Sequence, residues 1–256
     1  MSVEAWRLIR SGYRDGYYNM AVDEALFLSV KEEKAPPTLR FYGFSPACLS
    51  LGYSQRAEKE IDLSACRSLG IDVVRRPTGG RAVLHKGDIT YSVVARFPWS
   101  LKETYRYLSL ALATGLRSLG VEAQLAPARP GLRPGSPDCF ASPSWYELLV
   151  GGKKIAGSAQ KRDHNCFLQH GSVLIDLPSE ECRAIFGRSS SRDNVSCINE
   201  NLAYKVDFAQ VEEALLKGFQ EILRIPLVEE ELTVEEEWLT EKLRREQYLS
   251  YPWKPV

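Results

Sequence analysis

The spacing of apolar residues along the chain changes several times between helical and strand periodicity. In residues 17–33, apolar side chains recur every three or four positions, which predicts a helix that Asn19 could cap. Residues 60–70 and 101–120 have the same spacing, and each segment ends at a glycine, a residue that often terminates helices. We therefore predict three helices in the first half of the chain.

Short apolar runs between these helices are typical of strands. The runs lie at 38–44, 48–55, 71–77 and 88–97. Three further runs, at 145–150, 153–162 and 166–176, follow one another closely, and the pair Gly151-Gly152 joins the first two with residues that allow positive φ. Together these three runs predict a β-meander.

The remainder of the chain is predicted to be helical. A short helical pattern occupies 178–187, and two longer patterns occupy 206–223 and 233–249. Interleaved strands and helices of this kind predict one α+β domain over residues 1–256, in which helices flank a mixed β-sheet. A helical tail from about Phe208 is expected to pack on that domain.

The charge balance argues against nucleic acid as a partner. The 256 residues include 33 basic and 33 acidic side chains, so the chain lacks the sustained positive field that nonspecific nucleic-acid binding requires. It contains no run of about 18 apolar residues, and its first residues do not form a signal-peptide pattern. We expect a cytoplasmic protein that binds neither nucleic acid nor membranes.

The six cysteines are spaced without CxxC pairs, which indicates free thiols rather than a zinc site or a disulfide framework. Cys48 and Cys66 have the apolar neighbours of buried thiols, whereas Cys139 and Cys197 do not. Cys139 follows a loop rich in proline and glycine. The preceding Asp138 opposes thiolate formation, so activation of Cys139 would need a nearby cation or hydrogen-bond donors.

The three histidines do not suggest a metal centre. His85 and His170 are each followed within two residues by a glycine and could line a site, while His164 has the surroundings of a turn residue. Together they supply too few ligands for a convincing metal site. No metal is predicted.

A glycine pair lies where one strand runs into another, in the segment VVRRPTGGRAVLH. Gly79 and Gly80 let backbone N–H groups approach a carbonyl, phosphate or thioester, and Arg75, Arg76 and Arg81 offer charged donors nearby. The alternative is a tight hairpin whose arginines are only solvated. The segment has neither the GxxxxGK[ST] nor the GxGxxG spacing of nucleotide-binding loops.

Four small residues, Ala156-Gly157-Ser158-Ala159, stand in a predicted strand where bulkier side chains are usual. They indicate a close neighbour, which is either a ligand such as a methylene chain or a packed helix. Lys153 and Lys154 precede them, and adjacent strand residues point to opposite faces, so only one lysine can enter a pocket. Parity alone does not decide which one.

Three segments carry a family resemblance in this order: RRPTGGRAVLH, CFASPSWYELLVGGKKIAGSAQKR and LQHGSVLID. The chain resembles the biotin/lipoate protein ligase superfamily over nearly its whole length. Within that superfamily, the CFxxPSWYE segment resembles the octanoyltransferases with which Gram-positive bacteria begin lipoate assembly. The chain looks shorter than these relatives around 188–203, so contacts with carrier proteins are expected to differ there.

The resemblance implies transfer of an octanoyl group from acyl carrier protein to a lysine of an apo lipoyl domain, such as the glycine-cleavage H protein. It implies Cys139 as the nucleophile and selects Lys154 over Lys153 as the site lysine. The substrate pocket is expected to be formed by Arg76, Thr78, Gly79, Gly80, Ala82, His85, Gly157, Ser158 and His170.

Exchange between a thiolate and a thioester needs no ATP, so neither ATP nor another cofactor is expected. Lys154 and backbone N–H groups would stabilise the oxyanion, and Lys154 could also help deprotonate the acceptor amine. Three alternatives stay open: an ATP-dependent lipoate ligase, an amidotransferase that moves octanoate between lipoyl domains, and a non-catalytic acyl-binding module.

Overall fold

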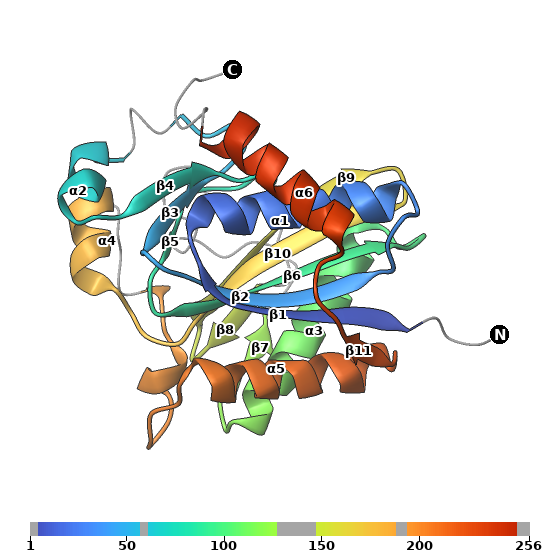
Figure 1. The fold of residues 1–256 in the computed structure, drawn as a ribbon. Helices are drawn as coiled ribbons and strands as arrows, with labels where there is room; N and C mark the ends of the chain where they lie inside the picture. The colour runs from blue at the N-terminus through green and yellow to red at the C-terminus, as the bar shows by residue number, and fades with distance from the viewer. Residues whose placement is uncertain (1–4, 57–60, 127–146, 188–193, 250–256) are drawn as a thin grey trace.

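The computed structural model describes residues 5–56, 61–126, 147–187 and 194–249 (Figure 1). The loop that contains Cys139 lies outside the described residues. None of the described helices is long and apolar enough to cross a membrane.

A mixed eight-stranded sheet forms the centre of the described structure, in the order β11-β1-β2-β6-β10-β9-β8-β7. Its strands are β1 (Trp6–Arg14), β2 (Thr38–Phe44), β6 (Asp88–Arg96), β7 (Gln124–Leu125), β8 (Leu148–Val150), β9 (Lys153–Asp163), β10 (Cys166–Leu174) and β11 (Leu227–Glu229). The strands β11, β1 and β2 pair in parallel, and the remaining pairs are antiparallel. The predicted α+β class with a mixed sheet is confirmed.

The predicted meander is also confirmed, because β8, β9 and β10 are consecutive neighbours in the sheet. Gly151 and Gly152 join β8 to β9 with φ angles of 56° and 80°, in the left-handed region that favours glycine. His164 forms the next turn with a φ of 53°, as expected of a turn residue.

A second, three-stranded sheet lies beside the first, in the order β4-β3-β5. It consists of β3 (Cys48–Leu51), β4 (Asp72–Arg75) and β5 (Val83–His85), and it packs on α2 (Leu63–Ser68) and α4 (Ser179–Phe186). The two helices lie together at the left of Figure 1. The sequence pattern does not reveal this separation, because strand periodicity says nothing about which sheet a strand joins.

Helices cover both faces of the large sheet. The helix α1 (Gly16–Lys31) lies on one face with α6 (Val234–Leu243) crossing it, and α3 (Leu101–Ser118) lies on the other with α5 (Phe208–Leu223) (Figure 1). A 3-10 turn at Ile198–Glu200 precedes α5, and a π-helical turn at Arg244–Tyr248 follows α6. The tail therefore packs on both faces of the sheet.

Two details of the helices differ from expectation. Asp15 caps α1 by accepting from the Tyr18 backbone, whereas Asn19 is buried and donates to the backbone oxygen of Gly43. The expected N-cap was therefore wrong, because Asn19 lies inside the helix and faces the core. The tail is not entirely helical either, since β11 pairs with β1.

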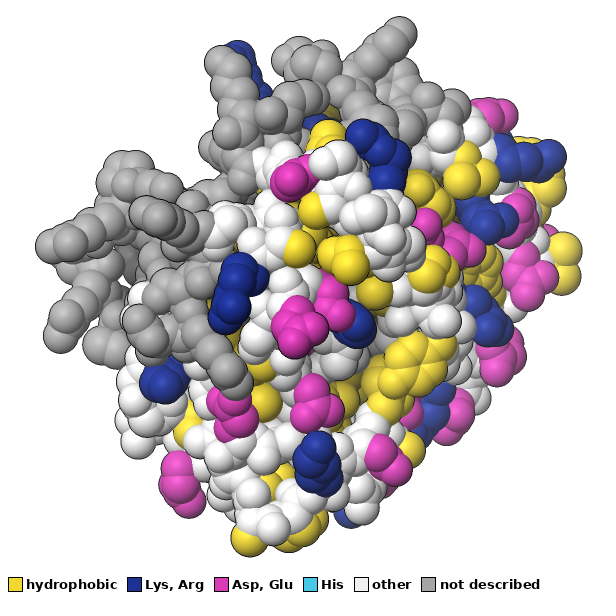
Figure 2. Space-filling view, turned by 90° about the vertical axis from the view of Figure 1, so that its left-hand side faces the viewer, with side chains coloured by type: hydrophobic (Ala, Val, Ile, Leu, Met, Phe, Trp, Pro, Cys, Tyr) yellow, Lys and Arg dark blue, Asp and Glu magenta, His cyan; other side chains and the backbone are white. Residues whose placement is uncertain are grey.

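The charged side chains on the face formed by α2 and α4 do not segregate by sign. Figure 2 shows Lys and Arg interspersed with Asp and Glu on this face, with apolar side chains between them. Mixed charge of this kind matches the equal totals of basic and acidic residues and gives no single-sign field here.

The two helices α3 and α5 cross at a glycine contact. A Cβ added at Gly218 would lie 2.2 Å from the Ala111 carbonyl oxygen and 2.5 Å from the Gly115 nitrogen. Real Cβ atoms do not approach backbone so closely, so the crossing requires glycine.

We expect Gly218→Ala to lower the free energy of unfolding by about 1–2 kcal/mol, because the clash at the crossing outweighs the better helix propensity of alanine. Urea unfolding measures the effect. Lys217→Ala, at an exposed neighbouring position of α5, is the matched control and should stay within about 0.5 kcal/mol. Equal stability of the Gly218→Ala variant and the wild type would contradict the close crossing.

Candidate active site

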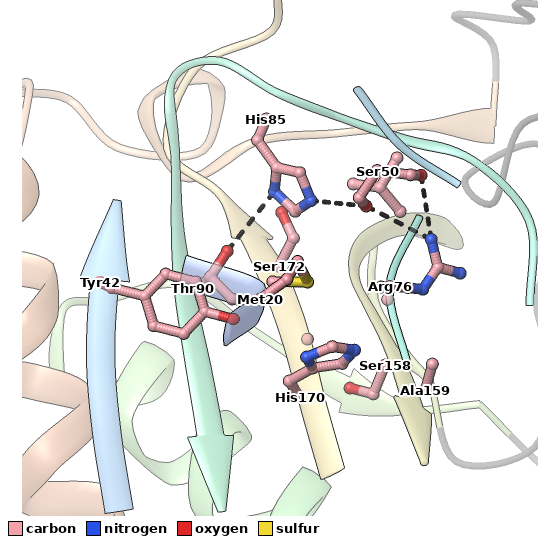
Figure 3. A pocket seen from close by; sticks show the side chains of 13 residues that line it. Met20, Tyr42, Ser50, Arg76, His85, Thr90, Ser158, Ala159, His170 and Ser172 are labelled. Atoms are coloured by element: carbon pink, nitrogen blue, oxygen red, sulfur yellow. Dashed lines mark hydrogen bonds between the residues drawn. The ribbon is translucent and has the colours of Figure 1, made fainter. Parts of the chain in front are cut away.

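A small cavity lies between the two sheets (Figure 3). Its lining comes from α1, from strands of both sheets and from the loop after β4: Met20, Tyr42, Ser50, Arg76, Val83, His85, Thr90, Gly157, Ser158, Ala159, His170, Gly171 and Ser172. The volume of about 30 Å³ holds roughly one or two water molecules. A larger ligand enters only if lining side chains move or if it extends past this cavity.

The run of small residues in β9 forms one wall of the cavity. Gly157, Ser158 and Ala159 all line it, so open space lies against this part of the run, as a ligand would require. Ala156 instead belongs to the core cluster that includes residues of α3 and α5, as the packed-helix alternative predicts. The neighbouring strand is equally constrained, because a Cβ at Gly171 would lie 2.5 Å from Ser158 Oγ and 2.7 Å from the Gly157 carbonyl oxygen. Small residues on both β9 and β10 thus leave space beside this wall.

Arg76 is buried and donates from each nitrogen of its guanidinium. Its Nε donates to Thr78 Oγ1 at 3.2 Å, and Nη1 donates to Ser50 O at 3.0 Å and Ser50 Oγ at 3.3 Å. Nη2 donates to the carbonyl oxygens of Gly79 and Arg81, both at 2.7 Å. An arginine has five N–H groups, so these five contacts match its full donor capacity. Arg76 therefore fixes the 76–81 loop and ties it to β3.

The glycine pair shapes the same loop. Gly80 has a φ of 92°, and a Cβ added at Gly52 would lie only 1.8 Å from the Gly80 carbonyl oxygen. Arg75 donates to the backbone oxygens of Gly52 and Gln55. The alternative in which Arg75 and Arg76 are only solvated is therefore wrong, because both arginines hold backbone carbonyls.

Two buried histidines connect Arg76 to buried carboxylates. His170 Nδ1 lies 2.8 Å from Asp23 Oδ2, and its Nε2 lies 2.6 Å from Thr78 Oγ1. A carboxylate only accepts hydrogen bonds, so we assign the ring proton to Nδ1, and the Thr78 hydroxyl then donates to Nε2. The Thr78 oxygen is left to accept from Arg76.

A second series of hydrogen bonds to Arg76 has the same order of groups: a carboxylate, an imidazole and a hydroxyl. His85 Nδ1 lies 2.8 Å from Asp88 Oδ2, and its Nε2 lies 2.9 Å from Ser50 Oγ, which in turn faces Arg76. Figure 3 shows His85, Ser50 and Arg76 joined in this way at the cavity. Two carboxylate–imidazole–hydroxyl chains therefore converge on one guanidinium.

Asp23 is the most enclosed of these carboxylates. It accepts from Arg40 at 2.8 Å, from the Tyr42 hydroxyl at 2.7 Å and from Ser92 at 2.8 Å. Burial by itself raises the pKa of Asp23, but the His170 hydrogen bond and the Arg40 charge outweigh it and lower that pKa overall. Asp23 is thus held as a carboxylate.

Burial has the dominant effect on the neighbouring ring. It lowers the pKa of His170, and the hydrogen bond and charge of Asp23 oppose that shift only in part. The neutral ring is the form that accepts from Thr78. The lowered pKa agrees with the neutral ring that the hydrogen-bond geometry indicates.

Lys154 occupies the start of β9 and is 1% exposed, whereas Lys153 is exposed. Its Nζ lies 2.6 Å from Glu147 Oε1 in a buried ion pair. Lys154 is therefore the inward-facing lysine of the pair, although it does not line the cavity described above. Cys139 lies outside the described residues, so its closeness to Lys154 stays a prediction.

The other predicted pocket residues fall into two groups. Arg76, His85, Gly157, Ser158 and His170 line the cavity. Thr78, Gly79 and Gly80 belong to the loop that surrounds Arg76. Ala82 is fully buried in the core beneath the second sheet and does not line the cavity.

Sequence reasoning missed several residues that hold the site together, namely Asp23, Asp88, Ser50, Met20 and Tyr42. A signal for Asp23 exists, because an acidic residue stands among the apolar positions of the helix NMAVDEAL. The expectation that Cys197 lacks apolar company was wrong: it is buried with Val83 and Leu174, which come from distant segments.

Within the described ranges, no group of three or more His, Cys, Asp and Glu side chains is placed to hold a metal ion. The histidines and carboxylates at the cavity are instead paired with hydroxyls and arginines.

The fold matches that of a solved lipoate-protein ligase, which makes this a catalytic domain of the lipoate-ligase type. The family model described as the lipoyl protein ligase A/B catalytic domain matches residues 15–220. The chain belongs to this family. The predicted resemblance to lipoate protein ligases is confirmed.

Two kinds of relatives are similar to this chain. One, from Geobacillus kaustophilus, is named "Octanoyltransferase LipM" and is 43% identical, covering 99% of each chain. A solved structure of lipoate-protein ligase A bound with ATP has a TM-score of 0.84 and 30% identity, covering 98% of each chain.

An archaeal structure is also similar. It describes a bi-partite lipoate protein ligase and its E2 lipoyl domain from Thermoplasma acidophilum, and has a TM-score of 0.78 and 28% identity, with 97% of this chain and 95% of that chain covered.

We expect Arg76→Lys to lower the free energy of unfolding by at least about 2 kcal/mol, because an ammonium has three donors and leaves buried carbonyls unpaired. Guanidinium chloride unfolding measures it. Arg81→Lys, at a half-buried position of the same loop, is the control and should change stability by less than about 0.5 kcal/mol. If both variants lose the same amount, the Arg76 network does not hold the loop.

The lowered pKa of His170 predicts a pH dependence of stability. Between that pKa and the ordinary histidine value of 6.5, the unfolded chain binds a proton that the folded protein excludes, so acidification favours unfolding. His170→Gln should therefore flatten the loss of stability between about pH 7 and about pH 5. Urea midpoints across this range test it, with the exposed His164→Gln as a control that keeps the wild-type slope.

Proposed function

We propose that this protein is an octanoyltransferase that moves an octanoyl group from acyl carrier protein to a lysine of an apo lipoyl domain, through a thioester on Cys139. The observation that carries the proposal is the 43% identity, over 99% of each chain, to a protein named as an octanoyltransferase. Transfer of this kind is the first step of lipoate assembly.

A lipoyl domain is the proposed acceptor, and the glycine-cleavage H protein is one example. Support comes from the similar archaeal ligase, whose structure was described together with its E2 lipoyl domain. Acyl carrier protein is proposed as the donor from the family resemblance alone.

The proposed reaction has two half-reactions. The Cys139 thiolate attacks the octanoyl thioester carbonyl, the bond to the carrier sulfur breaks, and the carrier thiolate leaves and takes up a proton. The acceptor amine then attacks the new thioester, an amide forms, and the Cys139 thiol is regenerated as the amine loses its proton. Both steps pass through a tetrahedral oxyanion.

Charge on that oxyanion needs preorganised donors. The Lys154 ammonium, buried at the start of β9, is the proposed charged donor, with backbone N–H groups of the glycine-rich strands beside it. Because a thioester is already activated, the proposed reaction uses neither ATP nor another cofactor.

The strongest rival is an ATP-dependent lipoate ligase. Such a ligase shares the fold, as the TM-score of 0.84 to lipoate-protein ligase A illustrates, but it activates a free acid and has no use for Cys139. The higher identity to the octanoyltransferase favours the transferase. An amidotransferase acting between lipoyl domains would also use a cysteine and differs in its donor.

Intact-mass spectrometry tests the proposal. After mixing with octanoyl carrier protein and no ATP, the wild type should carry one octanoyl group, which hydroxylamine removes and which peptide analysis places on Cys139. The Cys139→Ala variant should carry none, and Cys182→Ala, at a half-buried thiol, should behave as wild type. Adding apo H protein should then discharge the adduct.

Other outcomes identify the rivals. Octanoylation of H protein only with free octanoate and ATP would show a ligase, and an adduct only from octanoyl H protein would show the amidotransferase. Absence of any adduct and of any transfer would leave an acyl-binding module and refute the enzyme.

A further inference from the structure

Glu147 is a buried ion-pair partner of Lys154. The Lys154 Nζ and the Glu147 Oε1 are 2.6 Å apart, and their side chains are 1% and 6% exposed. Glu147 immediately precedes β8, the second strand from one end of the large sheet, and lies seven residues before Lys154. The tight turn at Gly151-Gly152 therefore brings the two charges together within one hairpin.

The backbones of both residues are held independently of this ion pair. The Ala126 N–H donates to the Glu147 carbonyl oxygen at 2.7 Å, and the Ser196 N–H donates to the Lys154 carbonyl oxygen at 2.9 Å. Val195 also forms a bridge with Lys154. Val195 and Ser196 thus pair with the strand that carries the lysine.

The pairing of β8 with β9 is also irregular where Glu147 and Lys154 come together. Lys154 lies opposite Leu149, yet Ala156 lies opposite Leu148, so the register shifts between these two pairs. A bulge of this kind re-aims side chains at the end of a strand. Here it accompanies a lysine and a glutamate that both turn inward, while Lys153 stays exposed.

Because Lys154 is buried, its protonation state depends strongly on a nearby carboxylate. An unpaired ammonium in a dry interior is disfavoured by several kcal/mol and tends to lose its proton. A carboxylate at hydrogen-bond distance reverses that tendency, because it stabilises the charged amine and accepts one of its protons. The geometry therefore favours the ammonium over the neutral amine.

A charged lysine and a neutral lysine do different chemistry. An ammonium donates hydrogen bonds to a developing oxyanion, and it cannot accept the proton of an incoming amine. Only the neutral amine could act as a base. The two roles proposed for Lys154 from its residue type therefore exclude each other at any one moment.

We propose that Glu147 is a positioning residue that keeps Lys154 protonated and fixed, so that Lys154 acts in octanoyl transfer as a stationary cation rather than as a base. This proposal rests on the proposed function for its kinetic part. Its structural part concerns the charge state of Lys154 and stands apart from any activity.

Glu147→Gln gives a test in which the two roles have opposite signs. The amide is isosteric and removes the negative charge. If Lys154 is a fixed cation, kcat for octanoyl transfer should fall about 10- to 100-fold while KM for the octanoyl donor stays within about twofold. If Lys154 is a base, losing the carboxylate enlarges the neutral fraction and the rate should rise.

Two further variants separate positioning from folding. Glu147→Asp keeps the negative charge and should therefore have a higher kcat than Glu147→Gln. If Glu147 only filled space, the isosteric glutamine should be the better replacement. Lys153→Ala, at the adjacent exposed lysine, is the matched control and should retain wild-type kcat. If Glu147→Gln does not fold, Glu147→Asp still tests whether Glu147 positions Lys154. Its shorter side chain should lower kcat without changing KM, and a wild-type kcat would contradict the proposal.

Nitrogen-15 NMR of the lysine side chains reads the charge state without any substrate. Comparison with Lys154→Met assigns the Lys154 signal, which should be that of an ammonium in the wild type and should move toward a neutral amine in Glu147→Gln. An unchanged ammonium signal, or a wild-type or higher kcat in Glu147→Gln, would overturn the proposal. Failure of the wild type to transfer octanoate at all would instead refute the proposed function, and the NMR result would still stand.

Discussion

The contacts of the Arg76 guanidinium hold the two sheets in register across the cavity. On one side it binds the backbone and hydroxyl of Ser50 in β3, and on the other it reaches β10 through Thr78 and His170. A guanidinium is planar and always charged, so it can hold several acceptors at fixed angles where a lysine cannot. Arg76 thereby links opposite walls of the cavity.

The same site shows how the chain keeps charges in its interior. Asp23 is paired with the Arg40 guanidinium and Glu147 with the Lys154 amine. Asp88 accepts from Thr90 and Ser172 and lies 2.8 Å from the His85 ring. Each carboxylate thus has a partner within hydrogen-bond distance, which is the condition under which burial of a charge is tolerated. Removing one partner leaves the other charge buried, so these residues are expected to vary together rather than singly.

The fold identifies the family, whereas the mechanism depends on individual side chains. The described fold is shared with an ATP-bound ligase, while the sequence is 43% identical to a relative named as an octanoyltransferase, so the fold itself does not choose between them. The choice depends on a few side chains. The proposed nucleophile Cys139 would distinguish the transferase, whereas a buried lysine paired with a glutamate suits either chemistry.

Much of the architecture was determined by the sequence itself. Periodicity located β6, β9, β10, α3 and α5 closely, because each is long and its apolar spacing is regular. It missed β1 and β11, since β11 is only three residues long and β1 gains its place by pairing with strands from distant segments. Ordered motifs determined the family, because they combine residue identity with spacing.

Which of these residues meet depends on how the elements pack in three dimensions. Strand parity left Lys153 and Lys154 equivalent, and burial beside Glu147 separated them. Nothing local marks Asp23 as the partner of His170, because 147 positions separate them and helix and strand meet only in the folded core. Sequence sets local conformation and chemistry residue by residue, whereas the pairing of buried charges depends on long-range packing.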